Sequence, residues 1–258
     1  QGWATAREAR VLREAWLLAS RIRSAVYLAL NAQTDVLPTS PVELDAVARL
    51  LAAYGIECAP SQVAADADEA VRIALPLLEA GGSVAVKLLS PDIAHKSDVD
   101  GVRLDLGSDA AVRDAADDIL HRARERRPDA RIDGLLVQPM ARRAKAREVI
   151  AGIADDPVFG PVVVFGRGGT AVEVIDDKAL ALPPLDLRLA HELIGRTRVA
   201  RVLKAYREVP AADERALALV LVKLAQLAAD IPEVREVDIN PLLADADGAV
   251  AVDARIAV

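Results

Sequence analysis

The 258-residue sequence has a net charge of −7, which argues against a general nucleic-acid-binding surface because such a surface normally carries a basic stripe. Its single cysteine, Cys58, excludes an internal disulfide and a thiolate metal cluster, and a chain of this length can form one domain or two lobes around a cleft. No apolar run reaches the roughly 20 residues that cross a bilayer and no signal peptide is visible, so we expect a cytoplasmic protein with no membrane or nucleic-acid partner.

The first part of the chain is mainly helical by the spacing of its apolar residues. Apolar residues recur every three or four positions over 6–31, and the stretch 35–41, with two prolines, follows as a linker. Because the sequence begins at Gln1 and not at methionine, we expect it to be part of a longer protein with further domains. The next expected elements are a helix from Pro41 to about Tyr54, a strand at 56–59 and a helix at 66–78 that is broken or closed near Pro76.

The remainder mixes strands with amphipathic helices. Because the two do not alternate strictly, the pattern favours two mixed lobes over one doubly wound sheet. Helices are expected at 109–127, 186–205 and 213–229. Strands are expected at 102–106, 134–138, 148–153, 162–165, 171–175, 234–239 and 249–252, after an opening strand that begins at Val84.

Chemistry-bearing residues concentrate between Val84 and Leu106. Lys87 interrupts an aliphatic strand, and because burying a charged amine is unfavourable unless an anion meets it, a phosphate is the expected ligand. His95 stands in the polar loop that follows. A histidine there can carry a phosphoryl group through a covalent intermediate, and an ordinary exposed loop histidine is the open alternative.

Two later stretches are candidates for the rest of a site. The glycine-rich turn at 166–169 matches neither a Walker nor a dinucleotide motif, but Glu173 follows it in the next expected strand; a tight strand connection is the alternative. Asn240 and Asp253, on the last expected strands, could bring their oxygens to one magnesium ion. Capping of turns beside Pro241 is the alternative.

Together these stretches resemble the ATP-grasp domain of the NDP-forming acyl-CoA synthetase superfamily, which includes the ADP-forming acetyl-CoA synthetases. The resemblance runs in order from about Pro41 to the end of the chain. It rests on Lys-Leu-Leu-Ser-Pro-Asp-Ile-Ala-His-Lys-Ser-Asp-Val at 87–99, Val-Gln-Pro-Met at 137–140, Asp-Pro-Val-Phe-Gly-Pro-Val-Val-Val-Phe-Gly-Arg-Gly-Gly-Thr at 156–170, Val-Glu-Val at 172–174, Asp-Ile-Asn-Pro-Leu-Leu at 238–243 and Val-Asp-Ala-Arg-Ile at 252–256.

The resemblance implies an α+β ATP-grasp fold in which two mixed lobes grip ATP or ADP with Mg²⁺ between them. The implied division is a leading helix and linker at 1–40, an N-terminal lobe at 41–137 and a C-terminal lobe at 138–258. The implied roles are phosphate contact by Lys87, a hinge against adenine at Gln138, Pro139 and Met140, a cleft-facing Glu173, magnesium ligands Asn240 and Asp253 with Asp238 as a weaker third, and a phosphate-carrying His95.

The leading hypothesis is therefore a phosphate-transferring part of an acyl-CoA synthetase, whose CoA-binding and ligase parts lie in other domains or in another subunit. The competing hypothesis is a non-catalytic nucleotide sensor fused to an acyltransferase, as in bacterial protein acetyltransferases. The histidine loop departs from the family pattern at Asp100, where the family has a glycine, and this departure bears on the choice between the two.

Overall fold

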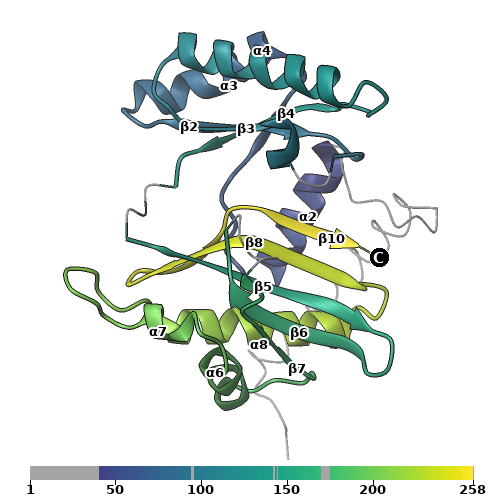
Figure 1. Ribbon diagram of the computed structural model, residues 1–258, viewed down its shortest axis with the longest axis vertical. Helices are drawn as coiled ribbons and strands as arrows, with labels where there is room; N and C mark the ends of the chain where they lie inside the picture. The colour runs from purple at the N-terminus through teal and green to yellow at the C-terminus, as the bar shows by residue number, and fades with distance from the viewer. Residues whose placement is uncertain (1–40, 94–95, 142, 144, 170–174, 258) are drawn as a thin grey trace, which may run out of the picture. The chain divides into compact units, whose positions relative to one another are not determined.

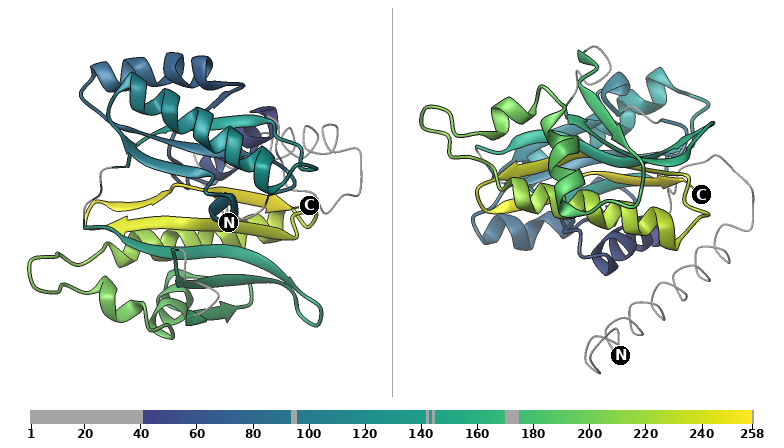
Figure 2. Two further views of the ribbon diagram at one scale, coloured as in Figure 1. Left: turned by 45° about the horizontal axis from the view of Figure 1, so that its top comes forward. Right: turned by 90° about the horizontal axis from the view of Figure 1, so that it is seen from below.

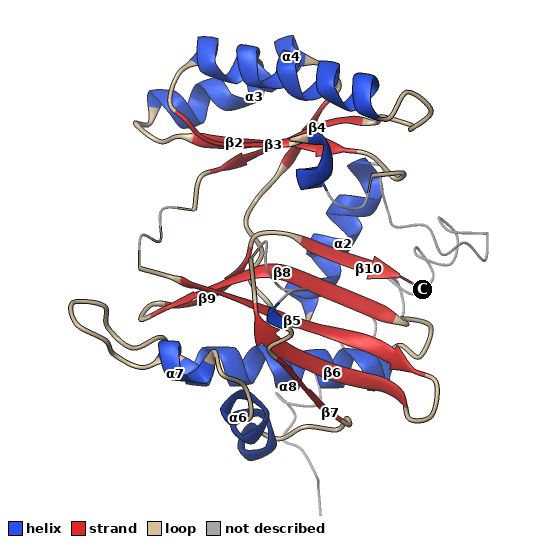
Figure 3. Cartoon of the chain, in the orientation of Figure 1, coloured by secondary structure: helices blue, strands red, loops and turns tan. Residues whose placement is uncertain are grey.

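The computed structural model describes residues 41–93, 96–141, 143, 145–169 and 175–257 (Figure 1). The chain divides into two compact units. The larger unit contains Asp45–Cys58 and Arg143–Val258, and the smaller unit contains Ala59–Arg142. Each consists of an antiparallel sheet with helices packed against one face, as the colours of Figure 3 show. The expected α+β composition is confirmed.

In the smaller unit, two helices cover one face of a four-stranded sheet of order β1-β4-β2-β3 (Figure 1). Apolar side chains from alternate strand positions join both helices in one core, and the opposite face of the sheet, which α3 and α4 do not cover, is its helix-free face among the described residues. The elements are β1 (Gln62–Ala64), α3 (Ala67–Glu79), β2 (Val84–Leu89), the 3-10 turn η1 (Lys96–Val99), β3 (Val102–Leu106), α4 (Asp109–Arg126) and β4 (Gly134–Pro139).

Both helices of this unit begin at residues suited to the N-cap position. The side chain of Asp66 accepts a hydrogen bond from the amide of Glu69 at the start of α3. Ser108 accepts one from the amide of Ala111 at the start of α4. Each cap satisfies an amide that has no partner within its own helix, and this fixes where the helix begins.

The larger unit is built on a sheet of order β10-β8-β5-β6-β7, with β9 paired to β8. Helix α8 lies along one face of this sheet (Figure 2). The elements are α2 (Pro41–Ala53), β5 (Arg147–Asp156), β6 (Gly160–Arg167), β7 (Lys178–Ala181), α6 (Leu187–Gly195), α7 (Ala200–Leu203), α8 (Glu214–Asp230), β8 (Glu236–Asp245), β9 (Gly248–Ala251) and β10 (Ala254–Ala257).

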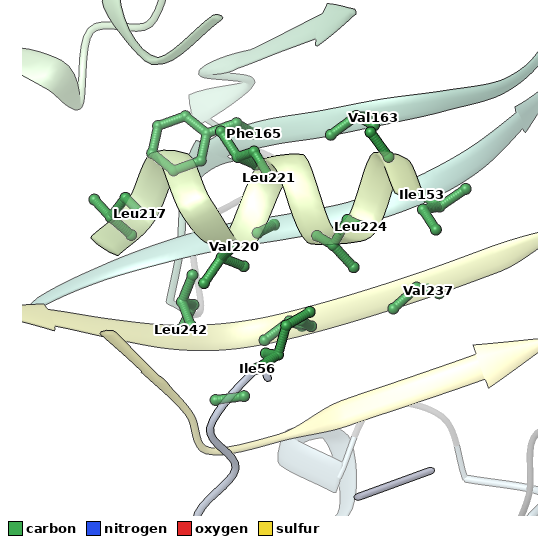
Figure 4. Close-up of a cluster of buried hydrophobic side chains, with 14 of the residues drawn as sticks. Ile56, Ile153, Val163, Phe165, Leu217, Val220, Leu221, Leu224, Val237 and Leu242 are labelled. Carbon is green, nitrogen blue, oxygen red and sulfur yellow. The ribbon is translucent and has the colours of Figure 1, made fainter. Parts of the chain in front are cut away.

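The core of the larger unit lies between α8 and the sheet (Figure 4). Leu217, Leu221 and Leu224, at helical spacing, are fully buried, as are Ile153 of β5 and Phe165 of β6. Residues at strand spacing therefore meet residues at helical spacing, and burying each of these large side chains contributes roughly 1.5–3 kcal/mol. Because the core takes alternate strand residues, the intervening residues lie on the opposite face, which α8 does not cover and which is the helix-free face of this sheet among the described residues.

Several expected elements are confirmed, and three are corrected. The expected strand at 56–59 is wrong: within the described part of the chain this segment forms a single bridge, between Cys58 and Ala251, and the short strand β1 follows it. Helix α3 is not broken at Pro76 but runs on to Glu79, and the amide of Ala80 then donates to the Pro76 carbonyl. The expected helix 6–31, the linker and most of the strand 171–175 lie outside the described residues.

The expected helix 186–205 is two helices. Its first part, α6, ends where the Thr197 hydroxyl donates to the Ile194 carbonyl. The carboxylate of Asp177, which comes from before β7, then accepts the amides of Arg198 and Val199, each at 2.7 Å. These bonds to a distant residue start a new turn, and the sequence pattern alone could not show them.

The compact units differ from a division at sequence position 137/138. The chain crosses between units at Arg142/Arg143, and Asp45–Cys58 belongs to the larger unit. The reason is apolar packing: Leu50, Leu51 and Ile56 are buried in the core that contains α8. The expected division into an N-terminal lobe at 41–137 and a C-terminal lobe at 138–258 stays a prediction.

Candidate functional site

Asn240 and Asp253 lie opposite each other where β8 pairs with β10. The register joins Ile239 to Ala254, and one residue further along, the Asn240 amide donates to the Asp253 carbonyl at 3.1 Å. Residues directly opposite in an antiparallel pair carry their side chains on the same face. Because Ile239 is buried in the core, the side chains of Asn240 and Asp253 belong to the helix-free face.

Asp238 belongs to the same face, two residues before Asn240. It lies opposite Arg255 of β10 on one side and Gly152 of β5 on the other. The third place among the magnesium ligands, which the resemblance implies for Asp238, stays a prediction.

The glycine-rich turn comes from β6 to meet this face. The Gly169 amide points to the Asn240 side-chain oxygen at 3.4 Å, and the Gly168 amide donates to the Glu148 carbonyl at 2.9 Å. A Cβ on residue 168 would lie 2.7–2.8 Å from backbone atoms of Val149, so no larger residue fits there without movement. Glycine at 168 is thus required by the close packing of the turn on β5, and the expected reason, approach of a ligand, is not needed to explain it.

Glu148 lies beside the candidate site, and the sequence reading did not single it out. One of its carboxylate oxygens lies 2.6 Å from the position that a Cβ on residue 169 would occupy. It therefore stands beside the amide that points to Asn240. A carboxylate at the start of a strand next to a glycine-rich turn could have drawn attention to Glu148. That signal can be read only when the pairing of β5 with β6 is known.

Among the described residues, no group of three or more His, Cys, Asp or Glu side chains is arranged to hold a metal ion. The donors that the structure brings together are the amide oxygen of Asn240 and the carboxylate of Asp253. Magnesium in proteins often takes only one or two protein carboxylates and completes its shell with water and substrate phosphates. This donor pair therefore fits a magnesium ion that arrives with a phosphate, and does not fit an all-protein cage.

In the smaller unit, Lys87 and Gln138 share the helix-free face of the sheet. The register pairs Lys87 with Leu136 and Ala85 with Gln138, so these four residues are on one face, and Val86 on the other face enters the core. Lys87 is 6% exposed and Gln138 5% exposed. The predicted phosphate contact and one predicted hinge residue therefore lie on neighbouring strands, diagonal to each other.

The predicted hinge continues through Pro139 and Met140. Proline has no amide hydrogen, and the Met140 amide donates to the Ser83 carbonyl at 2.8 Å. Neither residue therefore offers an N–H group to a base. Recognition of a base by these two residues would depend on their carbonyl acceptors.

His95 and Glu173, both predicted site residues, lie outside the described residues. The segments on both sides of His95 are described. On one side, the Ser90 hydroxyl donates to the Arg131 carbonyl at 2.6 Å; on the other, Arg126 donates to the Asp98 carbonyl at 2.9 Å.

Asp100, which replaces a glycine of the family pattern, has φ of +52°, in the left-handed region that glycine favours. Asp tolerates this region better than most residues. Its carboxylate accepts hydrogen bonds from Arg122 at 3.0 Å and Arg126 at 2.7 Å on α4. The replacement therefore attaches the segment after His95 to α4 without changing the backbone conformation that glycine would adopt.

Asp177 is a second residue that the sequence reading missed. Its buried carboxylate accepts the amides of Arg198 and Val199, and its carbonyl accepts the Arg167 amide at 2.9 Å. It thus joins the end of β6, just before the glycine-rich turn, to the segment that follows α6.

No helix in the described part of the chain is long and apolar enough to span a membrane.

Comparisons with known proteins agree with this geometry. A family model described as an ATP-grasp domain matches residues 39–258. The chain is 38% identical over 207 residues to the acetate–CoA ligase (ADP-forming) I subunit beta of Pyrococcus furiosus, a match that covers 80% of this chain and 87% of that subunit. It is 41% identical over 207 residues to the acetate–CoA ligase (ADP-forming) I of Archaeoglobus fulgidus, of which it spans 29%.

The solved structures include the acetyl-coenzyme A synthetase 1 of Ca. Korarchaeum cryptofilum in complex with coenzyme A and Ca-AMPCP. It matches with a TM-score of 0.80 and 31% identity, over 92% of this chain and 99% of that one. A second structure of that enzyme, with a phosphorylated phosphohistidine segment, matches with a TM-score of 0.74 and 29% identity, over 90% and 98% of the two chains. By its sheets, its ordered motifs and these matches, the chain belongs to the ATP-grasp family, in the branch of the ADP-forming acetyl-CoA synthetases.

Proposed function

We propose that this chain is the nucleotide-binding part of an NDP-forming acyl-CoA synthetase, which binds Mg-ATP or Mg-ADP and exchanges phosphate with an acyl donor. The observation that carries the proposal is the opposition of Asn240 and Asp253 on the helix-free face, with the Gly169 amide directed at Asn240. Two oxygen donors in one place suit a magnesium ion that arrives with phosphates, and the Gly169 amide orients the oxygen of Asn240.

Asn240 and Asp253 would hold the magnesium ion, with Asp238 as a third donor. A magnesium ion bound with ATP neutralises charge on the phosphate oxygens. Lys87 would contact the phosphates as a buried cation, and Glu173 would face the nucleotide. The hinge at Gln138, Pro139 and Met140 would contact adenine.

His95 is the proposed phosphate carrier. A ring nitrogen of the neutral imidazole attacks the γ-phosphorus of ATP, a nitrogen–phosphorus bond forms, and the bond from that phosphorus to the bridging oxygen breaks to release ADP. A later transfer of the phosphoryl group to the acyl carboxylate restores His95. The Korarchaeum structure with a phosphorylated phosphohistidine segment supports the same role here.

The CoA-binding and ligase parts would lie outside this sequence, on the same chain or in another subunit. The match to 29% of the Archaeoglobus enzyme and to 87% of a Pyrococcus beta subunit supports either arrangement. A cytoplasmic location, which the single cysteine favours, belongs to the same proposal.

The alternative of a catalytically inactive sensor fused to an acyltransferase is less well supported. Relatives whose match extends along most of this chain carry ligase or synthase names, among them a 4-hydroxybutyrate–CoA ligase and a trans-feruloyl-CoA synthase. Asp100, the departure that raised the alternative, fits the backbone conformation of the glycine that it replaces.

Calorimetry tests the nucleotide site directly. We expect the protein to bind ATP with Mg²⁺, and to bind it more weakly when EDTA removes the metal. ATP should bind more tightly than GTP, because carbonyl acceptors in the hinge suit the amino group of adenine and repel the O6 of guanine. Absence of ATP binding in the presence of Mg²⁺ would overturn the proposal.

A further inference from the structure

We propose that the tip of the β5–β6 hairpin, with the cavity beside it, is the surface by which this chain docks onto the remaining part of the synthetase. The proposal rests on the proposed function in naming the partner. It concerns the end of the sheet at the β5–β6 turn, and of the residues that line the cavity only Asp238 also belongs to the proposed nucleotide site.

The tip exposes two large apolar side chains next to each other. Val158 is 79% exposed and Phe159 66% exposed. They lie in the short turn between β5 and β6, at the end of the sheet in Figure 1. Exposed apolar side chains found singly need no explanation, but an adjacent valine and phenylalanine at a projecting turn are typical of a contact surface.

The turn is held in one conformation. One carboxylate oxygen of Asp156 accepts the amides of both Val158 and Phe159, at 2.9 and 3.0 Å. Gly160 then closes the turn with φ of +71°, a conformation that a larger residue rarely adopts. Because the tip is already ordered, little conformational entropy is lost when it binds a partner.

A cavity of about 360 Å³ lies beside the tip, on the helix-free face of the same sheet. It begins at Pro157, next to the tip, and extends to Leu180, which is 45% exposed. Val162 and Val164 of β6 form part of its wall. The tip and the cavity together offer a protruding apolar group and an adjoining recess, which a partner of complementary shape can fill.

The charges around the cavity indicate what kind of partner fits. Four carboxylates and one lysine line it, so the surface is acidic. A partner surface with an apolar centre and a basic rim is complementary, and its association should weaken as salt is added. The lining residues with charge are Asp155, Asp156, Glu236, Asp238 and Lys178.

The relatives indicate that a partner polypeptide exists in some arrangements of the enzyme. The region that matches this chain makes up 29% of the ligase of Archaeoglobus. In Pyrococcus the corresponding region is a separate beta subunit. Where it is a separate subunit, non-covalent contacts must hold it to the rest of the enzyme. The hairpin tip and cavity supply a preformed apolar surface for that contact.

The test prepares the synthetase as two polypeptides, this chain and the remaining part, as in the subunit arrangement of Pyrococcus. Val158→Ser combined with Phe159→Ser should lower the association constant at least about tenfold, since aromatic side chains are enriched at the buried centre of interfaces, where truncation weakens binding most. The matched control is Val202→Ser with Tyr206→Ser, also an exposed valine and an exposed aromatic residue of the larger unit. The control should leave association within about twofold of the unchanged chain.

A second measurement uses the unchanged protein. Hydrogen exchange of the Val158 and Phe159 amides should slow when the remaining part of the synthetase is added. Association that is unaffected by the double substitution, or exchange at the tip that does not change, would overturn the docking proposal. Sedimentation measures the association without nucleotide, so the docking proposal and the proposed nucleotide function can fail separately.

Discussion

The amide of Asn240 donates to the carbonyl of Asp253 at 3.1 Å, and this single bond brings two oxygen-bearing side chains from the last strands of the sheet to one face. They are thirteen positions apart in the sequence, and the turn of the β8–β9 hairpin lies between them. The pairing of β10 with β8 is thus what makes a two-donor site from two distant motifs.

Asp253→Asn should weaken binding of Mg-ATP at least about tenfold, because a charge-assisted contact typically contributes about 1.5–3 kcal/mol. ATP binding in EDTA should change little. Calorimetry with and without Mg²⁺ measures both. Asp247→Asn, at an exposed turn of the same unit, is the control and should leave both values unchanged. Equal losses with and without the metal would contradict the role of Asp253 as a magnesium ligand.

Lys87→Met should also weaken ATP binding about tenfold or more, since it removes a cation that is only 6% exposed and keeps a similar side-chain length. The loss should be larger for ATP than for adenosine, because the phosphates are the expected partners. Lys204→Met is the control: Lys204 is exposed and pairs with Glu214, and surface pairs contribute little. Equal effects on ATP and adenosine would refute a phosphate contact.

Two glycines offer a matched pair for stability. Gly168→Ala should lower the free energy of unfolding by about 1–3 kcal/mol, since its Cβ would meet the Val149 backbone within 3 Å. Gly195→Ala, at the end of α6, should raise the free energy of unfolding by about 0.4–1 kcal/mol, because the added Cβ would lie in open space, with no neighbouring element within 4 Å. Urea unfolding measures both. A neutral Gly168→Ala would mean that the turn moves away from β5 at little cost.

The pH dependence of stability should include a contribution from Asp118. Hydrogen bonds from Arg122 and then from Arg103 hold the pKa of the Asp118 carboxyl below its ordinary value. A lowered pKa in the folded state stabilises the fold above the ordinary pKa of about 3.9, and this contribution is lost as pH falls through the folded value.

The difference in Tm between the unchanged chain and Asp118→Asn should therefore be positive at pH 7 and shrink as the pH is lowered below about 4. Asp114→Asn, on the same helix, serves as the control, because Asp114 forms no ion pair with another described residue. A Tm difference that stays constant from pH 7 to pH 3 would contradict the role of the ion pairs.

Much of the fold follows from local pattern. The helices α4 and α8 and the strands around Lys87 were predicted within one or two residues, because their periodicity and caps are contained in the sequence. The break between α6 and α7 was missed, since it depends on Asp177, which is distant in sequence from Arg198. Strand β7 was missed as well: it is four residues long and partly exposed, so its pattern is weak.

Some residues of the candidate site could likewise be predicted from the sequence and others could not. Asn240, Asp253 and Lys87 could be proposed from their residue types and from motif order, and the structure adds the faces that they share. Glu148 could not be proposed, because only the pairing of β5 with β6 brings it beside Gly169. The reason for Gly168 was likewise hidden, since its constraint comes from a neighbouring strand.

The transfer of phosphate to His95 is the central claim, and labelling tests it most directly. The full-length protein is incubated with Mg-ATP that carries a label on the γ-phosphate, beside His95→Gln as control. We expect an acid-labile, base-stable label on the unchanged protein and none on the variant, with ATP binding retained by both. A protein that binds ATP but takes up no label would contradict the proposed phosphate-transferring enzyme and favour the non-catalytic nucleotide sensor. A label that persists in His95→Gln would mean that another residue carries the phosphoryl group.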